Sequence, residues 1–299
     1  MKEMLIVLNK DEHTVSYVDA NSGQTLEKIS VDKNPHEVVV TRDGNYSYVT
    51  NSGGNSLSVF NNQTMEEEQR VTHPGFKFPH GVGLSKDEKT LWIASTYANM
   101  LFLLDTGTWK VRKEIATAQY LVHMISFAPD GNKVYVPNIG SNNVTVVDAV
   151  KEEVISHLRV GKGPEGVAVH PGNKELYVAN QDDDILDIYS VDTLERVKRL
   201  RLGRCPIRLV FSPDGRYAFI PNREGDCLSV IDTEIQGEIK RIPVGIWPGG
   251  TVFDAAGQRA WVANNKTNDI SVIDVATLKE TGRIEAGIHP DGIGYIAGD

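Results

Sequence analysis

Short runs of apolar residues, each ended by a small polar residue, recur along the whole chain. One of them is Tyr177-Val178-Ala179-Asn180, and equivalent runs end at Asn9, Asn51, Ser95, Asn138, Asn222 and Asn264. Runs of about four to eight residues rich in Val, Ile, Leu and Tyr are typical of β-strands, and helical periodicity is nearly absent. The pattern therefore predicts an all-β protein.

A second set of equivalent residues gives the period of the repeat. Each follows a proline or its substitute, and together we call them the ring position: His36, His80, His123, Glu165, Ile207, Gly249 and Asp291. Successive members are separated by 42 to 44 residues when their numbers are subtracted. Four short antiparallel strands in every 40 to 45 residues, roughly, are typical of propeller blades. The sequence predicts a seven-bladed β-propeller with four-stranded blades.

The phase of the repeat predicts how the ring closes. The chain opens with three strands, at residues 5–8, 14–18 and 26–31, and finishes on one strand at residues 292–297. We expect this last strand to pair with the opening three, so that the N-terminal and C-terminal segments share one closing blade and leave no long edge exposed. Residues 1–299 are then expected to form a single domain.

Composition excludes some classes of function. A formal net charge of -9 argues against binding of nucleic acid or of an anionic membrane, because phosphates would be repelled over most of the surface. No apolar run is long enough to span a bilayer, and the repeat begins near the first residue without an apparent secretory signal. We expect a cytoplasmic protein unless the chain is a trimmed form of an exported one. The two cysteines, Cys205 and Cys227, form no disulfide framework.

Some of the repeats also resemble a known family. The segment Tyr48-Val49-Thr50-Asn51 with Asn55 to Val59, and the segment from Asn264 through Ile270 to Asp274 with Gly287 and Pro290, resemble the YVTN-type seven-bladed propeller repeat. The resemblance covers essentially the whole chain. It implies that the first strand of each blade lines a central channel and that ligands bind on the face where the loops before the first strand and after the second strand lie. It implies no particular activity.

Three histidines hold the ring position in three successive blades. In the geometry that the resemblance implies, His36, His80 and His123 meet at the channel mouth, with Glu165 on one side and Asp291 on the other. Such a set fits a divalent transition metal, Zn, Fe, Cu, Mn or Ni, with an open coordination position. Glu165 and Asp291 are then candidate catalytic residues that ligate, orient a histidine or act as base. Alternatively, the histidines only satisfy neighbouring polar groups at a solvated mouth.

Two arginines and four aromatic residues are candidates for substrate binding. Arg208 follows the ring position and Arg223 follows Asn222, so both guanidinium groups could face an anionic group, although surface arginines are common. The aromatic candidates in loops of the same face are Phe78, Tyr97, Tyr120 and Trp247. They could form a wall around a pocket or merely cover the end of the propeller.

These residues favour a metal-dependent enzyme that acts on a small molecule at a three-histidine site in the channel. A hydrolase or lyase is preferred because it needs only a Lewis acid and a base, and an iron or copper oxygenase could use the same ligands. Two alternatives stay open. One is a metal-free enzyme similar to the seven-bladed lactonases and cycloisomerases, and the other is a propeller scaffold that binds a protein partner.

Overall fold

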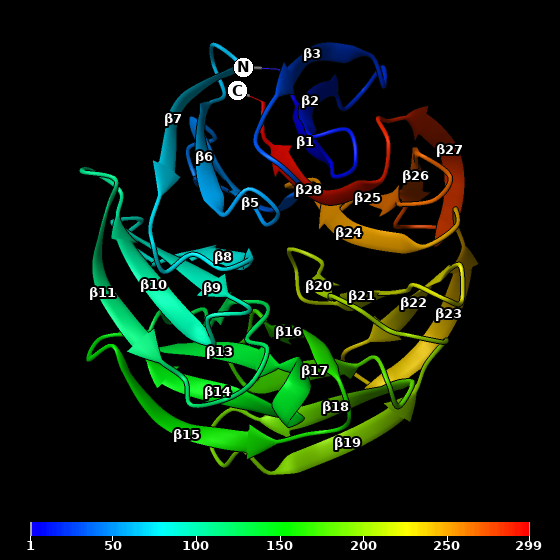
Figure 1. Cartoon of the computed structure of the whole chain (residues 1–299). Helices are drawn as coiled ribbons and strands as arrows, with labels where there is room; N and C mark the ends of the chain where they lie inside the picture. Colours follow the sequence, from blue (N-terminus) through cyan, green and yellow to red (C-terminus); the bar gives the residue numbers. More distant parts are fainter. Residues whose placement is uncertain (1, 299) are drawn as a thin grey trace.

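The computed structural model, which describes residues 2–298, contains seven four-stranded antiparallel sheets arranged around a central axis (Figure 1). Within that range the one helix is a single 3₁₀ turn at Ile139–Ser141. The prediction of an all-β seven-bladed propeller with four-stranded blades is therefore confirmed. No helix in residues 2–298 has the length and apolar character needed to cross a membrane.

Six of the blades follow one another along the chain, and the first strands of most neighbouring blades contact each other around the axis. Blade 1 contains β4 (Pro35–Val40), β5 (Tyr46–Asn51), β6 (Ser56–Asn61) and β7 (Glu66–Thr72). Blade 2 contains β8 (Pro79–Leu84), β9 (Thr90–Ser95), β10 (Met100–Asp105) and β11 (Lys110–Ala116). Blade 3 contains β12 (Ser126–Phe127), β13 (Lys133–Asn138), β14 (Asn143–Asp148) and β15 (Glu153–Arg159). Blade 4 contains β16 (Pro164–Val169), β17 (Glu175–Asn180), β18 (Ile185–Ser190) and β19 (Arg196–Arg201). Blade 5 contains β20 (Val210–Phe211), β21 (Tyr217–Asn222), β22 (Cys227–Asp232) and β23 (Gly237–Pro243). Blade 6 contains β24 (Pro248–Phe253), β25 (Arg259–Asn264), β26 (Asp269–Asp274) and β27 (Lys279–Glu285).

The seventh blade closes the ring with strands from both ends of the chain. Its innermost strand, β28 (Pro290–Ile296), pairs with β1 (Met4–Asn9), and β2 (Thr14–Asp19) and β3 (Thr25–Ser30) continue outward. Leu5 lies opposite Tyr295 in the antiparallel register, and the dark blue and red strands lie side by side in Figure 1. The predicted shared blade is confirmed.

The core consists of seven apolar clusters, each between two neighbouring blades. Tyr135 of blade 3 packs in one cluster with Val178 of blade 4, for example, and Trp261 of blade 6 packs near Leu5 of the closing blade. Because each sheet is covered on both faces, apolar residues follow one another in the second and third strands instead of alternating with polar ones. At about 25 cal/mol for each Å² of apolar surface buried, these seven interfaces supply the main force that holds the ring together.

A repeated hydrogen bond joins each blade to the loop that leads into the next blade. In blade 2, Asn99 at the tip of the β9–β10 hairpin has a φ of 59°, and its side-chain oxygen accepts the backbone N–H of Leu121 at 2.8 Å. Leu121 itself has a φ of 57°. The equivalent pairs are Asn55 with Phe78, Asn142 with Gly163, Asp184 with Cys205, Asp226 with Trp247 and Asn268 with His289. We call these contacts the clasps, and they fix the loops that surround the channel mouth.

The innermost strands are crowded at the axis. Gly81 donates its backbone N–H to the carbonyl oxygen of His123, and a Cβ atom at Gly81 would lie only 2.4 Å from that oxygen. Only glycine allows such an approach. In blades 3 and 5 the inner strand is reduced to two residues, so that His123 and Arg208 lie just before a regular strand, not within one.

Candidate functional site

The structure brings the three ring-position histidines together at one side of the channel. The ring centroids of His36 and His80 are 4.1 Å apart, and those of His80 and His123 are 3.7 Å apart. His80 therefore lies between the other two, and it stacks on His123 with an angle of 26° between the ring planes. The close approach of strands β4 and β8 and the loop before β12 produces this cluster.

A carboxylate holds each of the two outer histidines. Nε2 of His36 lies 3.2 Å from Asp291 Oδ2, and the Lys10 ammonium group lies 3.3 Å from the same oxygen. Nε2 of His123 lies 3.6 Å from Glu165 Oε1. An ionised carboxylate only accepts hydrogen bonds, so the Asp291 contact favours a proton on Nε2 of His36, whereas the Lys10 ammonium group, 3.5 Å from the same nitrogen, can only donate to it.

The other ring nitrogens have no such support. Nδ1 of His36, His80 and His123 is buried, and none of the three has a hydrogen-bond partner among residues 2–298. Burial lowers the pKa of His36 and of His80 well below the usual 6.5, since the charged imidazolium would lose its hydration. These two rings are therefore neutral at neutral pH.

The stacked arrangement differs from that of a preformed metal centre. A histidine binds a metal in the plane of its ring at about 2.0–2.1 Å, so the ligand rings must have planes that meet at the ion. The nearly parallel planes of His80 and His123 do not meet within that distance. Accordingly, no group of three or more His, Cys, Asp or Glu side chains in the described part of the chain has the arrangement to hold a metal ion. A three-histidine site would need one of these rings to turn.

Arg208 connects three carboxylates around the histidine cluster. Its Nη1 donates to Asp291 Oδ1 at 2.6 Å, and its Nε donates to Glu37 Oε1 at 2.9 Å. Its backbone N–H donates to the Glu165 carboxylate. The guanidinium group is buried with these partners and does not line the pocket that the histidines form. The contact of Arg208 with a substrate thus stays a prediction. For such a contact, the guanidinium group would have to exchange Glu37 or Asp291 for the substrate.

The buried charges shift the carboxyl pKa values in different directions. Burial raises the pKa of Glu37 from 4.5 to about 7, although the charge of Arg208 opposes the shift. For Asp291, burial acts in the same direction but the charge of Arg208 outweighs it, so the pKa lies well below 3.8. Burial would raise the pKa of Glu165 as well, but the hydrogen bond and charge of His123 and the charge of Arg208 lower it to about 2. Asp291 and Glu165 are therefore ionised at neutral pH.

A pocket of about 200 Å³ opens at the channel mouth over the histidines. Lys10, Glu165, Gln181 and Arg223 complete its polar lining, and Phe78 and Ile139 supply apolar surface. The Arg223 guanidinium group lies 6.0 Å from the ring centroid of Trp247 and makes no hydrogen bond or ion pair with any residue from 2 to 298. An unpaired guanidinium beside an ammonium group and neutral imidazoles favours an anionic ligand.

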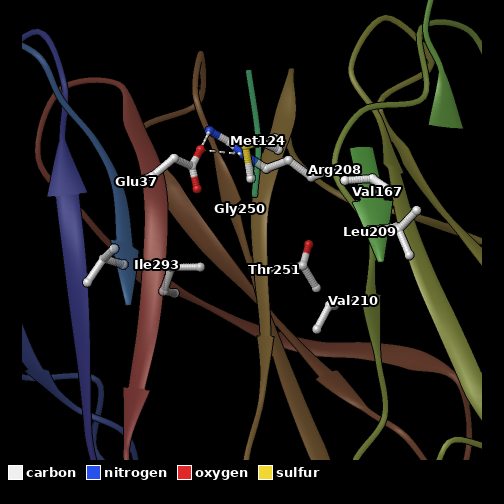
Figure 2. Close-up of a pocket in the computed structure, with 10 residues that line it drawn as sticks. Glu37, Met124, Val167, Arg208, Leu209, Val210, Gly250, Thr251 and Ile293 are labelled. Carbon is white, nitrogen blue, oxygen red and sulfur yellow. Dashed lines mark hydrogen bonds and ion pairs between the residues drawn. The ribbon is translucent and has the colours of Figure 1, made fainter. Parts of the chain in front are cut away.

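A second cavity, of about 180 Å³, lies further along the channel. Figure 2 shows the Arg208 side chain reaching across to Glu37, with Thr251, Val210 and Ile293 deeper in the same cavity. Its lining mixes apolar side chains with Glu37, Arg208 and Thr251, and it shares no lining residue with the histidine pocket. The Arg208 ion pairs thus lie between the two spaces.

The four predicted aromatic residues are brought together only in part. Phe78 lines the histidine pocket, with its ring 5.8 Å from that of His36, and Tyr97 packs against Phe78 at 4.9 Å. Tyr120 is 70% exposed and lines neither the pocket nor the second cavity. Trp247 is also absent from these linings, and the Lys266 ammonium group lies 3.4 Å from its ring centroid.

Lys10 and Glu37 are site residues that the sequence interpretation missed. Both were detectable from the repeat, because Lys10 follows Asn9 as Arg223 follows Asn222, and Glu37 follows the ring position as Arg208 does. Their positions in these two phases of the repeat are the signal that marks them as residues of the channel mouth.

A comparison with known families decides the classification. A family model described as a YNCE-like beta-propeller matches residues 2–293. The chain belongs to this family. Membership of the YNCE-like beta-propellers establishes the propeller fold across the chain, and the narrower resemblance to YVTN-type repeats remains a prediction.

Other known proteins are similar to this YNCE-like propeller over different lengths. The PE-PGRS family protein PE_PGRS18 of Mycobacterium tuberculosis is 47% identical over 49 residues, which are 16% of this chain and 10% of that protein. Hydrazine synthase from Kuenenia stuttgartiensis is 22% identical, with a TM-score of 0.84 over 91% of this chain and 92% of its own. A protein from Bacteroides uniformis described as "a putative 6-phosphogluconolactonase" is 17% identical, with a TM-score of 0.83 over 99% of this chain and 100% of its own. At these identities the two structures show the fold alone.

Proposed function

We propose that this propeller is a metal-free enzyme that hydrolyses a small cyclic ester bearing an anionic group. One observation carries the proposal. Two buried histidine–carboxylate pairs, His36 with Asp291 and His123 with Glu165, border the same pocket as the unpaired guanidinium group of Arg223. The pocket thus combines groups that move protons with a cation that can hold an anion.

These groups suit the hydrolysis of a lactone. Water adds to the carbonyl carbon, the ring C–O bond breaks, and the proton lost by the water reaches the leaving alkoxide, so that the product is a hydroxy acid. A neutral imidazole such as that of His36 can take this proton and return it. The positive charge of Lys10 stabilises the oxyanion that develops on the carbonyl oxygen, and Arg223 holds the anionic group of the substrate.

The similarity to the Bacteroides uniformis protein agrees with this class of reaction, because its name describes a lactonase. The likeness concerns the fold, so the pocket and not the name supports the proposal. The size of the pocket, about 200 Å³, fits a small molecule.

An assay of proton release with a panel of neutral and phosphorylated lactones tests this proposal. We expect the anionic lactones to be hydrolysed faster, His36→Ala to lower kcat by at least about 100-fold, and Arg223→Gln mainly to raise KM. Arg204→Gln is the matched control, because Arg204 is exposed on the same blade and donates to the backbone oxygen of Glu224. If the protein hydrolyses none of the lactones faster than they hydrolyse in buffer alone, the proposal is wrong.

A second candidate function is metal-dependent catalysis at His36, His80 and His123. It is favoured by the three buried Nδ1 atoms without partners in residues 2–298, since neutral imidazole nitrogens are good ligands for Zn, Fe, Cu or Ni. A modest rotation of the stacked rings would be needed to aim these atoms at one ion. Asp291 and Glu165 would then orient the ligands from outside the metal site.

Elemental analysis of protein purified without a metal-affinity tag separates the two candidates. A near-stoichiometric transition metal that is lost in His80→Ala, with the fold preserved by circular dichroism, would favour the metal centre. Absence of metal after incubation with Zn, Fe, Cu, Mn and Ni would leave the metal-free hydrolase as the better explanation.

A further inference from the structure

An open groove lies beside the histidine pocket on the same face of the propeller. Its walls come from the β5–β6 hairpin of blade 1, at Ser52, Gly53 and Asn55, and from two loops of blade 2, at Lys77, Phe78 and Tyr97. Phe78 lines both the groove and the histidine pocket, so the two spaces share this wall. The groove has no role in the reaction proposed above.

The groove presents aromatic surface in a fixed position. The rings of Phe78 and Tyr97 are 4.9 Å apart and inclined by 39°, and the Tyr97 side chain is 65% exposed. The backbone of Phe78 has a φ of 58°, which is uncommon for a bulky residue, and the clasp from Asn55 holds it there at 2.8 Å. A rigid aromatic residue at a pocket edge provides contact area at little cost in conformational entropy.

The ring contacts continue from the groove into the pocket. Tyr97 contacts Phe78, and Phe78 in turn lies 5.8 Å from the ring of His36 and 6.2 Å from that of His80. A ligand that occupies both spaces must pass Phe78. The charged head of this ligand would lie near Arg223, and a short spacer would connect the head to a flat group stacked on Tyr97.

We propose that the groove is a second subsite that binds a flat apolar ring of the same substrate. The inference rests on the proposed function and narrows its substrate class: an organic anion joined by a short spacer to an aromatic ring. Planar groups stack on exposed aromatic side chains, and Lys77 at the edge of the groove adds a positive charge.

Two probes with the same charged head test the subsite by isothermal titration calorimetry. Adenosine 5′-monophosphate carries a flat base at C1 of the ribose, where ribose 5-phosphate carries a hydroxyl group. We expect the wild-type protein to bind the nucleotide about tenfold more tightly, as one stacking contact gives. In Tyr97→Ala this ratio should fall below about twofold, while the affinity for ribose 5-phosphate stays unchanged.

Two further variants separate this inference from the proposed function. Tyr120→Ala, which removes an exposed aromatic ring outside pocket and groove, should keep the tenfold ratio. Arg223→Gln should weaken both probes by the same factor, because it acts on the shared head. The subsite alone is overturned if the wild-type protein binds the two probes with nearly equal affinity. It is also overturned if the ratio of the two affinities is the same in Tyr97→Ala as in the wild type. Failure of both probes to bind overturns the anion pocket and, with it, the subsite.

Discussion

Arg208 holds the histidine cluster through both its side chain and its backbone. The guanidinium group binds Glu37 and Asp291, and the backbone N–H binds Glu165. Since Asp291 and Glu165 in turn hold His36 and His123, one residue fixes both histidine–carboxylate pairs. Its own φ of 45° is unusual for arginine, so the neighbouring blades impose this position.

We expect Arg208→Met to lower the free energy of unfolding by about 3–5 kcal/mol. The substitution leaves the Glu37 carboxyl group buried without a cation and leaves Asp291 with Lys10 alone, which is the costly way to break a buried ion pair. Arg241→Met is the control, because Arg241 pairs with Glu238 while its side chain is 47% exposed, and its loss should cost less than about 1 kcal/mol. Urea unfolding of both variants measures the difference, and equal costs would contradict the assigned role.

Glu165 gives the stability of the protein a defined pH dependence. Its pKa falls from 4.5 to about 2 on folding, so its ionised form stabilises the folded state at pH values above 4.5, and this contribution is lost as the pH falls towards 2. We expect Glu165→Gln to be less stable than the wild type by up to about 3 kcal/mol at pH 7, and by clearly less at pH 3.

Denaturant unfolding at the two pH values measures this effect. Glu195→Gln, at the exposed tip between β18 and β19, serves as control and should stay within about 0.5 kcal/mol of the wild type at both. If the difference in free energy of unfolding between the wild type and Glu165→Gln is as large at pH 3 as at pH 7, the ionised carboxylate is not the source of that difference.

At the scale of the elements, the clasps give the propeller its regular mouth. Each places an Asn or Asp with positive φ at a hairpin tip, where these two residue types are better tolerated than others. In the closing blade His13 takes this place, and its Nδ1 lies 3.3 Å from the backbone nitrogen of Asn34. The clasps thus position the loops that carry Phe78 and precede His123.

Two substitutions at Asn99 separate the hydrogen bond of the clasp from its backbone conformation. Asn99→Gly keeps a residue that accepts a φ of 59° but loses the bond to Leu121, which should cost about 1 kcal/mol. Asn99→Ala loses the bond and also strains the backbone, so we expect about 2 kcal/mol or more. Thermal unfolding gives the order of the two variants, and a more stable Asn99→Ala would refute this explanation.

At the scale of the whole molecule, the shared blade closes the ring without a covalent bond between the ends. Deletion of residues 289–299 removes β28, exposes the edge of β1 and breaks contacts with both neighbouring blades. We expect the truncated protein to aggregate or to lose its cooperative unfolding transition. Size-exclusion chromatography and thermal unfolding measure both properties.

A circular permutant is the matched control for this truncation. A short linker joins the two chain ends, and the chain is opened between Asp192 and Thr193, which are exposed in the turn between β18 and β19. All strands are then retained, so the permutant should keep the elution volume of the unmodified protein and fold cooperatively. A truncated protein as stable as the permutant would show that β28 is not needed for closure.

Much of this architecture could be predicted from the repeat, and some of the site could not. The phase of the ring position anticipated which residues reach the mouth, including His36, His80 and His123. It did not anticipate that Arg208 would bind Glu37, which lies 171 residues away in the sequence. The partner of a buried charge depends on which opposite charge the final packing brings within a few ångströms, and the repeat carries no information on that distance.

The sequence alone determined the seven blades, their four strands and the shared closing blade, because a regular period places equivalent residues in equivalent environments, and the resemblance to a known repeat added that the ring-position residues face the channel. The tertiary structure decided that the rings of His80 and His123 stack, that Arg208 lies buried between two cavities and that Arg223 lines the pocket without an ion-pair partner among the described residues. These outcomes arise where the innermost strands converge on the axis. The space there admits few side-chain arrangements, and the choice among them depends on all the surrounding charges at once.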